Sequence, residues 1–299
     1  MCNDLIKKLE KRVNNKIKLK PIFSGGDNEI LLKKFLNRQN YLKPKNIFSI
    51  IKINFLKESP IGYALYKNDT EIVGFLGTIF SDRKIKNSIY NHCYLHSWIV
   101  DKDYRTQSFR LITPILEKKV FISTFSPIKS LEGLYEKLEF NVKNFSSKII
   151  LTFPTNFFNQ NKVAISEDKS FYENILTDDL KKIYKDHLLL KNSIVFAYFN
   201  NDIKDHILII VRKRYKKFII PILEIIYVSD SLKFKKNEKN INYELIKRFK
   251  TLILKENFFN NNSIFSENYF FSKIKNKKAY YKNIPENFNF DFLYSEILN

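Results

Sequence analysis

The segment that most limits the possible folds is Trp98–Ile112, in which an apolar strand runs directly into a polar, arginine-bearing loop. Its letters are WIVDKDYRTQSFRLI, and the apolar spacing after the loop predicts an amphipathic helix. A strand–loop–helix junction points several backbone N–H groups at one place, where the positive end of the helix dipole adds to them. Phosphate is the natural ligand of such a place. The segment therefore predicts an α/β protein with a phosphate site near residues 105 to 110.

This loop resembles the pyrophosphate loop of the GCN5-related N-acetyltransferase (GNAT) family, (Q/R)-x-x-G-x-(G/A), which follows a strand ending in V-x-x-x-Y. After Tyr104, the matching positions are Arg105, Thr106, Gln107, Ser108, Phe109 and Arg110. Ser108 replaces a glycine, but it is small and can donate a hydroxyl. Arg110 replaces Gly or Ala, so it either blocks the loop or pairs with a phosphate itself. We favour pairing.

Two further segments extend the resemblance to about residues 55 to 153. Gly62–Phe80 reads as two strands around the turn KNDT, a hairpin that the family places before its cofactor strand. Gly133–Phe140, GLYEKLEF, resembles the family helix LYEKxGF, with Glu139 in place of Gly. All three segments occur in the family's order. The resemblance implies an α/β (α+β) fold, an acyl-CoA N-acyltransferase-like mixed sheet flanked by helices.

A subset of these acyltransferases, associated with bacterial surface-polysaccharide loci, gives a closer resemblance. Its chains are of similar length and close with a segment like FDFLYSEIL, found here at Phe290–Leu298. Its loop often reads YRxxSxxLL, which matches Tyr104, Arg105, Ser108, Leu111 and Ile112. In this subset, serine at the position of Ser108 is usual, so its presence here does not indicate that the loop is impaired.

The organisation predicted from the sequence is bipartite, with a GNAT-like domain at residues 1–155 and a second domain at 156–299. Pro154 and the polar run at 156–162 suit a linker. The second half repeats the order of hairpin, strand, loop and helix without phosphate-loop spacing. We interpret it as a degenerate second copy of the fold, with an unrelated α+β extension as the alternative. The expected strands are Ile61–Tyr66, Glu71–Phe80, Tyr94–Val100, Lys119–Phe125, Lys148–Phe153, Ser193–Tyr198, His206–Val211 and Phe218–Val228. The expected helices are Glu29–Phe35, Ser108–Lys118, Leu131–Leu138 and Tyr243–Leu254.

Composition adds weaker limits. The net charge of +21 would suggest a nucleic-acid partner, but only eight of the 52 basic residues are arginine, and Asn, Ile and Phe abound. This is the codon bias of an AT-rich genome, and no nucleic-acid-binding motif accompanies it, so a nucleic-acid partner is not expected. No signal peptide or membrane span is recognisable, and Cys2 and Cys93 form no disulfide framework. We expect a cytoplasmic bacterial protein, either a monomer or a homodimer.

The resemblance implies acetyl-CoA, or another acyl-CoA, as co-substrate. Its pyrophosphate would sit at Arg105–Arg110, and the backbone of Ile99 and Val100 would donate to the pantetheine arm and the thioester carbonyl. Tyr135 matches the family tyrosine that protonates the leaving thiolate; the alternative is an aromatic packing residue. His96 lies on the cofactor strand and could relay a proton from the acceptor amine, although a half-buried structural histidine is the simpler interpretation.

No metal site is expected, because His92 and His96 are about 13 Å apart on a strand. The function predicted is transfer of an acyl group from CoA to a primary amine of a small acceptor, which we suggest is an amino sugar. Two alternatives stay open: an aminoacyl-tRNA-dependent transferase of the peptidoglycan-bridge type, and a non-catalytic binding member of the fold. The first would suit the basic charge, but no long helical arm is visible. Arg110 would suit the second.

Overall fold

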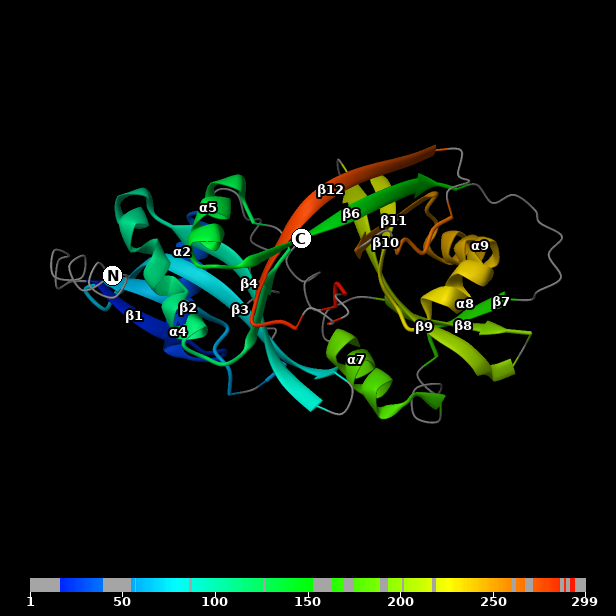
Figure 1. Ribbon diagram of the computed structural model, residues 1–299, viewed down its shortest axis with the longest axis horizontal. Helices are drawn as coiled ribbons and strands as arrows, with labels where there is room; N and C mark the ends of the chain where they lie inside the picture. Colours follow the sequence, from blue (N-terminus) through cyan, green and yellow to red (C-terminus); the bar gives the residue numbers. More distant parts are fainter. Residues whose placement is uncertain are drawn as a thin grey trace. The chain divides into compact units, whose positions relative to one another are not determined.

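The computed structural model describes residues 17–39, 55–56, 58–85, 88–125, 127–152, 163–168, 175–188, 193–200, 202–216, 219–259, 262–266, 271–285, 288 and 291–293 (Figure 1). The chain forms two compact units. The first contains residues up to Arg83 and Tyr90–Ile122, and the second contains Lys84–Ile89 and almost everything from Ser123 onward. The predicted domain boundary at residue 155 stays a prediction; the compact units divide the chain earlier, within β5.

The first unit is built on a sheet with the strand order β1-β2-β3-β4-β5. The β1–β2 and β2–β3 pairs are antiparallel. Asn68 and Asp69 both have positive φ, 51° and 62°, as a tight two-residue hairpin turn requires. The hairpin predicted around KNDT is therefore confirmed. The strands are β1 (Ile17–Ile22), β2 (Gly62–Lys67), β3 (Glu71–Ile85), β4 (Ser88–Val100) and β5 (Phe121–Thr124).

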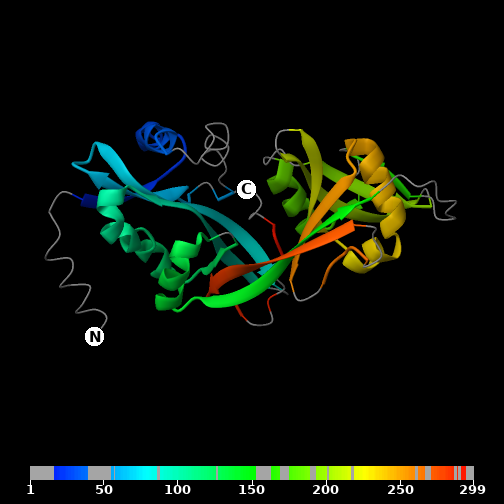
Figure 2. The same ribbon diagram turned by 90° about the horizontal axis from the view of Figure 1, so that it is seen from above.

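Helix α2 (Asp27–Asn37) covers one face of this sheet. Its apolar side, Leu32, Phe35 and Leu36, packs on Tyr66 and Phe75 in a core that excludes water. Figure 2 shows α2 on one side of the strands and the segment after β4 on the other. The two layers enclose β4, which carries His96, Ile99 and Val100 of the predicted site.

The segment after β4 differs from the prediction of one α-helix over Ser108–Lys118. A 3₁₀ helix, η1 (Lys102–Leu111), comes first, and the α-helix α4 (Thr113–Leu116) is a single turn. Pro114 lacks an N–H and fits only the first turn of an α-helix, so α4 cannot begin much earlier. The residues expected to form a free loop and a helix N-terminus are coiled into a 3₁₀ helix instead.

The second unit has the strand order β12-β6-β11-β10-β9-β8-β7. Strands β8, β9 and β10 form antiparallel pairs, and β10 lies parallel to β11 across a helical connection. This is the predicted order of hairpin, strand and helix, followed by one more strand. The strands are β6 (Asn141–Leu151), β7 (Val163–Ser166), β8 (Ser193–Phe199), β9 (Asp202–Lys216), β10 (Ile220–Val228), β11 (Ile253–Phe259) and β12 (Phe271–Lys282). The helices are α5 (Lys129–Lys137), α7 (Asp178–Leu188), α8 (Ser231–Lys236) and α9 (Glu238–Phe249).

Helices α8 and α9 occupy a stretch for which the sequence predicted a loop and a later helix. The Asp230 side chain accepts a hydrogen bond from the backbone N–H of Lys233 (2.9 Å) and caps α8, while Phe234 is fully buried. The left-handed Lys250 (φ 50°) ends α9. The helix predicted at Tyr243–Leu254 is therefore wrong at both ends, and Leu254 is a core residue of β11.

A buried polar network anchors the chain after β11. Glu256 accepts hydrogen bonds from the backbone N–H of Ile264 (2.9 Å) and from the Ser263 hydroxyl. The Lys148 ammonium donates to the carbonyls of Phe265 (3.1 Å) and Ser266 (2.8 Å). Glu256 and Lys148 are each 3% exposed, so their partners in this network replace water.

Some predictions lie outside the described residues: the linker at Pro154 and 156–162, and most of the closing segment Phe290–Leu298. Strands β1, β7, β11 and β12 and helix α7 were not predicted. Strand β12 is rich in lysine, a poor strand former, and a long antiparallel pairing with β6 holds it in the sheet.

Candidate active site

The predicted phosphate loop lies entirely within η1. Arg105 and Thr106 are exposed, Ser108 and Phe109 are half-buried, and Gln107 is 7% exposed. In a 3₁₀ helix each N–H pairs with the carbonyl three residues earlier, so the backbone amides of this segment bond within it. Side chains, rather than free amides, are what η1 offers to a ligand. A 3₁₀ run of ten residues is long, since such runs seldom exceed four.

Arg110 is turned toward the protein. Its guanidinium lies 3.3 Å from the carbonyl oxygen of Ile17 on β1 and 3.3 Å from the Gln107 side-chain oxygen. Both contacts are long for hydrogen bonds. Arg110 therefore joins η1 to the edge strand, and its role as a phosphate ligand stays a prediction.

The strand before η1 is interrupted at Ser97, whose φ is 47°. A non-glycine residue in the left-handed region is strained, and within a strand it breaks the regular alternation of side chains. Residues with strained backbone conformations are often found at functional sites, where the packing around them keeps them in that conformation. Ile99 and Val100 lie two and three residues after Ser97 and lead into η1. The predicted pantetheine-binding residues thus come from an irregular end of β4.

His96, just before the interruption, is buried against β3. A Cβ atom added to Gly77 would lie 2.1 to 2.4 Å from the His96 ring atoms, so the missing side chain of Gly77 makes room for the imidazole. The His96 Nδ1 is 3.0 Å from the Ser97 hydroxyl, and Nε2 has no hydrogen-bond partner among the described residues. Burial lowers the pKa of His96 to about 3. His96 is neutral at physiological pH and is a weak base.

Arg38, at the end of α2, holds the beginning of η1. Its guanidinium donates to the Asp101 carboxylate (2.5 Å), the Glu71 carboxylate (2.8 Å) and the carbonyl of Ile72 (2.6 Å). Asp101 is the residue before η1, and the Gln39 side chain also donates to it (3.0 Å). The Arg38 hydrogen bond lowers the pKa of Glu71. Arg38 therefore joins α2, β3 and the β4–η1 junction.

Tyr135 lies in the second unit, on α5. It is 2% exposed, and its ring stacks on Tyr280 of β12 with centroids 5.1 Å apart. Burial raises the pKa of Tyr135, and a hydrogen bond with Thr124 opposes that shift. The phenol is protonated at physiological pH, which is the state that an acid requires.

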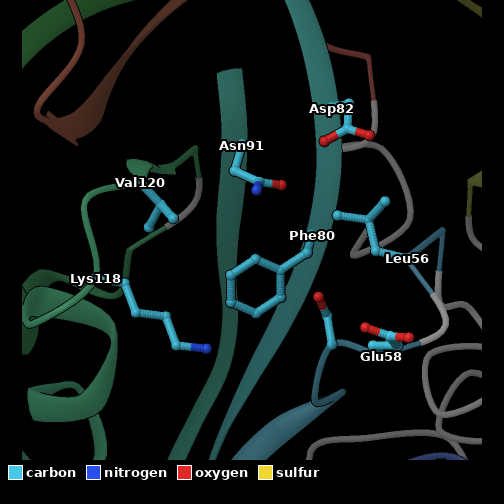
Figure 3. Close-up of a pocket in the computed structure, with 8 residues that line it drawn as sticks. Leu56, Glu58, Phe80, Asp82, Asn91, Lys118 and Val120 are labelled. Carbon is cyan, nitrogen blue, oxygen red and sulfur yellow. The ribbon is translucent and has the colours of Figure 1, made fainter. Parts of the chain in front are cut away.

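A polar pocket of about 550 Å³ lies in the first unit (Figure 3). Lys118 extends over the Phe80 ring, with its Nζ 5.2 Å from the centroid, and Glu58 and Asp82 also line the cavity. Asn91 lies on its wall, nine residues before Val100 on the same strand. Nine strand residues span about 30 Å, so the Asn91 wall of this pocket is far from the end of β4 at Val100.

Within the part of the chain that the structure describes, no group of three or more His, Cys, Asp or Glu side chains could hold a metal ion. His92 stacks on Tyr94 (4.0 Å between centroids), and burial lowers its pKa well below the usual value. None of the described helices is long and apolar enough to cross a bilayer.

Neither a protein-family model nor a curated protein matches the sequence. In structure, the chain has the fold of the acyl-CoA N-acyltransferases. The GCN5-related N-acetyltransferase of Anabaena variabilis is similar with a TM-score of 0.57 at 10% identity, over 88% of this chain and 72% of its own. That of Kribbella flavida gives 0.58 at 9% identity, over 89% and 71%.

Saccharomyces cerevisiae N-myristoyltransferase with bound myristoyl-CoA is also similar, with a TM-score of 0.54 at 9% identity. The match covers 91% of this chain and 84% of that enzyme. At such identities the likeness concerns the fold alone. It confirms the predicted mixed α/β architecture and the predicted resemblance to the GNAT fold.

Sequence reasoning missed four residues that shape the site: Gly77, Ser97, Arg38 and Tyr280. Gly77 carried a usable signal, because a glycine within a strand marks a close approach by another group. Ser97 is an ordinary strand residue in sequence, and nothing nearby predicts its positive φ. Arg38 and Tyr280 act across long sequence separations, which periodicity cannot reveal.

Proposed function

We propose that the chain is an acyl-CoA-dependent N-acyltransferase that uses acetyl-CoA and acts on a primary amine. The observation that carries the proposal is the interruption of β4 at Ser97, two residues before Ile99 and five before the basic segment η1. A strand that loses its regular pairing leaves backbone N–H and C=O groups for a ligand that runs alongside it. The pantetheine arm of CoA carries two amides that suit such groups. The acyl-CoA N-acyltransferase fold supports the same conclusion.

The pyrophosphate would be held mainly by side chains. Arg105 supplies an exposed guanidinium, and Thr106 and Ser108 supply hydroxyl donors on the same helix. This differs from a glycine loop, where free amides do most of the binding, because the amides of η1 bond within it. Gln107, Phe109 and Arg110 complete the proposed binding segment.

In the proposed reaction, the amine nitrogen attacks the thioester carbonyl carbon, and the C–S bond breaks. The amine gives up one proton, and the leaving thiolate takes up another. Tyr135 is proposed as the acid that supplies the second proton, since its phenol is protonated at neutral pH, although burial raises its pKa and makes it a weaker proton donor. His96, with a pKa of about 3, is better suited to accept a hydrogen bond from a neutral amine than to store a proton.

For the acceptor we propose a small amine, specifically an amino sugar. The support is the sequence resemblance to acyltransferases of surface-polysaccharide loci. The test is a panel of free and nucleotide-linked amino sugars, with amino acids and polyamines as competing amine classes. Turnover confined to the amino sugars supports the assignment, and turnover of another class replaces it.

Thermal unfolding with acetyl-CoA, CoA and 3′-dephospho-CoA tests the cofactor first, because a ligand that binds only the folded state raises the midpoint. We expect a shift with acetyl-CoA that Arg105→Ala removes and Lys34→Ala keeps. Lys34 is the matched control, since it is an exposed cation of the same unit that lies on α2, outside η1. No shift at millimolar acetyl-CoA would exclude the acyltransferase function.

Tyr135→Phe separates binding from chemistry. We expect the acetyl-CoA affinity to stay within twofold and kcat to fall about a hundredfold, the usual effect of losing a general acid. A kcat within threefold of the parent would remove Tyr135 from the mechanism. A large loss of affinity would show instead that Tyr135 has a structural role through Tyr280.

A further inference from the structure

One end of the second unit exposes a group of apolar side chains where β9 turns into β10. A hydrogen bond from the backbone N–H of Ile219 to the carbonyl of Lys216 (3.2 Å) closes this turn. Ile219 is 80% exposed, more than any other large apolar residue that the structure describes. Exposed apolar side chains also lie on both sides of the turn and at the start of β11. We call this group the apolar tip, and its members are Tyr215, Ile219, Ile220 and Leu252.

The turn and the start of β11 lie side by side, although about thirty residues separate them in the sequence. The parallel pair of β10 and β11 begins at this end, with Ile222 opposite Ile253. The Thr251 hydroxyl donates to the carbonyl of Pro221 (2.8 Å), which joins the two segments just before that pair. The apolar tip is therefore one surface.

An apolar cavity of about 480 Å³ adjoins the tip, at the place where α9 ends and β10 and β11 begin. Single apolar residues on a surface are ordinary, but several of them beside an apolar hollow mark a surface that binds something. Two lysines, Lys247 and Lys250, also line the hollow. Its apolar lining consists of Leu151, Ile220, Pro221, Ile246, Leu252 and Ile253.

Cations surround the tip. Lys216 and Lys250 are exposed beside it, at the ends of β9 and α9. The Lys213 ammonium donates to the carbonyl of Phe249 (2.7 Å), so it is held near the end of α9 without a carboxylate partner there. The described residues in 211–222 and 245–255 include no Asp or Glu. The tip is thus apolar at its centre and positively charged around it.

We propose that the apolar tip docks on the surface of an anionic lipid membrane. Ile219, Ile220 and Leu252 would enter the boundary of the acyl chains, and the lysines would meet the anionic headgroups. Lysine suits this position, because its stem packs along apolar groups while its ammonium stays among the headgroups.

Two other occupants of the tip fit less well. A small fatty acid would fill the cavity, but it would leave Ile219, which is not part of the lining, in water. A second copy of the chain would bring like charges together. The membrane accounts for the exposed turn, the cavity and the lysines together, and the proposal is independent of the acyltransferase function.

Cosedimentation of the full chain with lipid vesicles tests the proposal. Phosphatidylcholine vesicles are compared with and without phosphatidylglycerol, in the absence of acyl-CoA. We expect binding only to the anionic vesicles, and we expect added salt to weaken it. Ile219→Ser should weaken binding about tenfold, because it removes a large apolar side chain from the contact.

The matched control for Ile219 is Leu232→Ser on α8. Leu232 is 79% exposed, and α8 follows the far end of β10, so this residue is away from the tip. Binding by this variant should stay within about twofold of the parent.

A second pair of variants tests the charge. Lys216→Gln/Lys250→Gln should weaken binding to anionic vesicles about tenfold, whereas Lys235→Gln/Lys236→Gln on α8 removes the same charge and should change it little. All of these side chains are exposed, so the variants should keep the thermal midpoint of the parent, which excludes loss of the fold as a cause.

Absence of binding to anionic vesicles would overturn the proposal. Equal losses in the tip variants and the α8 variants would overturn it too, because the net charge of the chain would then be responsible. Self-association without lipid that Ile219→Ser abolishes would replace the membrane with a second copy. Binding of soluble octanoate without binding of vesicles would replace it with a small ligand. None of these outcomes bears on the acyltransferase function.

Discussion

At the scale of single residues, the most informative pair is Gly77 and His96. The histidine ring occupies the volume where a side chain at position 77 would lie. Cores are packed closely enough that one added methyl group must displace something. The two residues are therefore coupled, although they come from different strands. From the sequence, His96 was noticed as a titratable group and Gly77 as part of a hairpin arm, and only the fold connects them.

Gly77→Ala should lower the free energy of unfolding by about 1–3 kcal/mol, because the new methyl group collides with the imidazole. Urea unfolding followed by the fluorescence of Trp98, the single tryptophan of the chain, reports on β4 directly. Gly74→Ala is the control, since its Cβ would lie 3.1 Å from the flexible end of Leu65. In a protein that already carries His96→Ala, the free energy of unfolding lost through Gly77→Ala should be smaller by at least about 1 kcal/mol. Additive losses would show that the two sites are independent.

His96 also makes stability depend on pH. In the unfolded chain its pKa is about 6.5, and in the folded protein about 3. Below pH 6.5 the unfolded state binds the proton and the folded state does not, so stability falls as the pH falls. When the pH is lowered from 7.5 to 5.5, the protonation of this histidine in the unfolded chain should lower the free energy of unfolding by about 1.4 kcal/mol. His96→Gln should reduce the measured pH dependence by that amount, and an unchanged slope would contradict the burial of His96.

At the scale of elements, the sequence predicted what depends on local pattern. The β2–β3 hairpin was predictable because the turn residues Asn68 and Asp69 accept positive φ. The helical structure after β4 was not predictable. The apolar spacing of Leu111, Ile112 and Ile115 is equally compatible with one longer α-helix and with a 3₁₀ turn joined to a short α-helix. The phosphate loop was located by its resemblance, whereas its 3₁₀ conformation depends on contacts with β1 and α2 that are distant in sequence.

Arg38→Met should loosen the β4–η1 junction, because it removes three hydrogen bonds that hold Asp101, Glu71 and the carbonyl of Ile72. The expected loss of stability is about 1–2 kcal/mol, since the guanidinium is partly exposed. Hydrogen exchange at residues 101 to 111 should speed up. Lys33→Met on the same helix removes one i,i+4 ion pair and should cost less than about 0.5 kcal/mol. Equal effects of the two variants would argue against a special role for Arg38.

At the scale of the whole molecule, the chain forms two units with separate cores. The sequence indicated a bipartite chain and a second half with a related order of elements. It did not predict that β6, from the middle of the chain, lies between β11 and β12 in the second unit. Strand order depends on pairing between residues more than 100 positions apart, and no local pattern records it.

Lys148→Met tests how far a disturbance in the second unit spreads. It leaves Glu256 buried without its nearby cation and frees the carbonyls of Phe265 and Ser266. The expected cost is about 3 kcal/mol, typical of breaking a buried charge pair. We expect faster hydrogen exchange in β6, β11 and β12, because the network lies wholly within the second unit. Equal acceleration in β2 and β3 would mean that both units unfold as one.

The place of β6 has a consequence for how the protein is made. Strand β6 ends at Leu151, and its neighbours, β11 and β12, begin only at Ile253 and Phe271. At about 5–20 residues per second, a ribosome needs roughly 5–20 s to add the intervening hundred residues. For that time both hydrogen-bonding edges of β6 lack the strands that will pair with them. Newly made chains are therefore most exposed to wrong pairing and to capture by chaperones in this interval, well before the second unit can close.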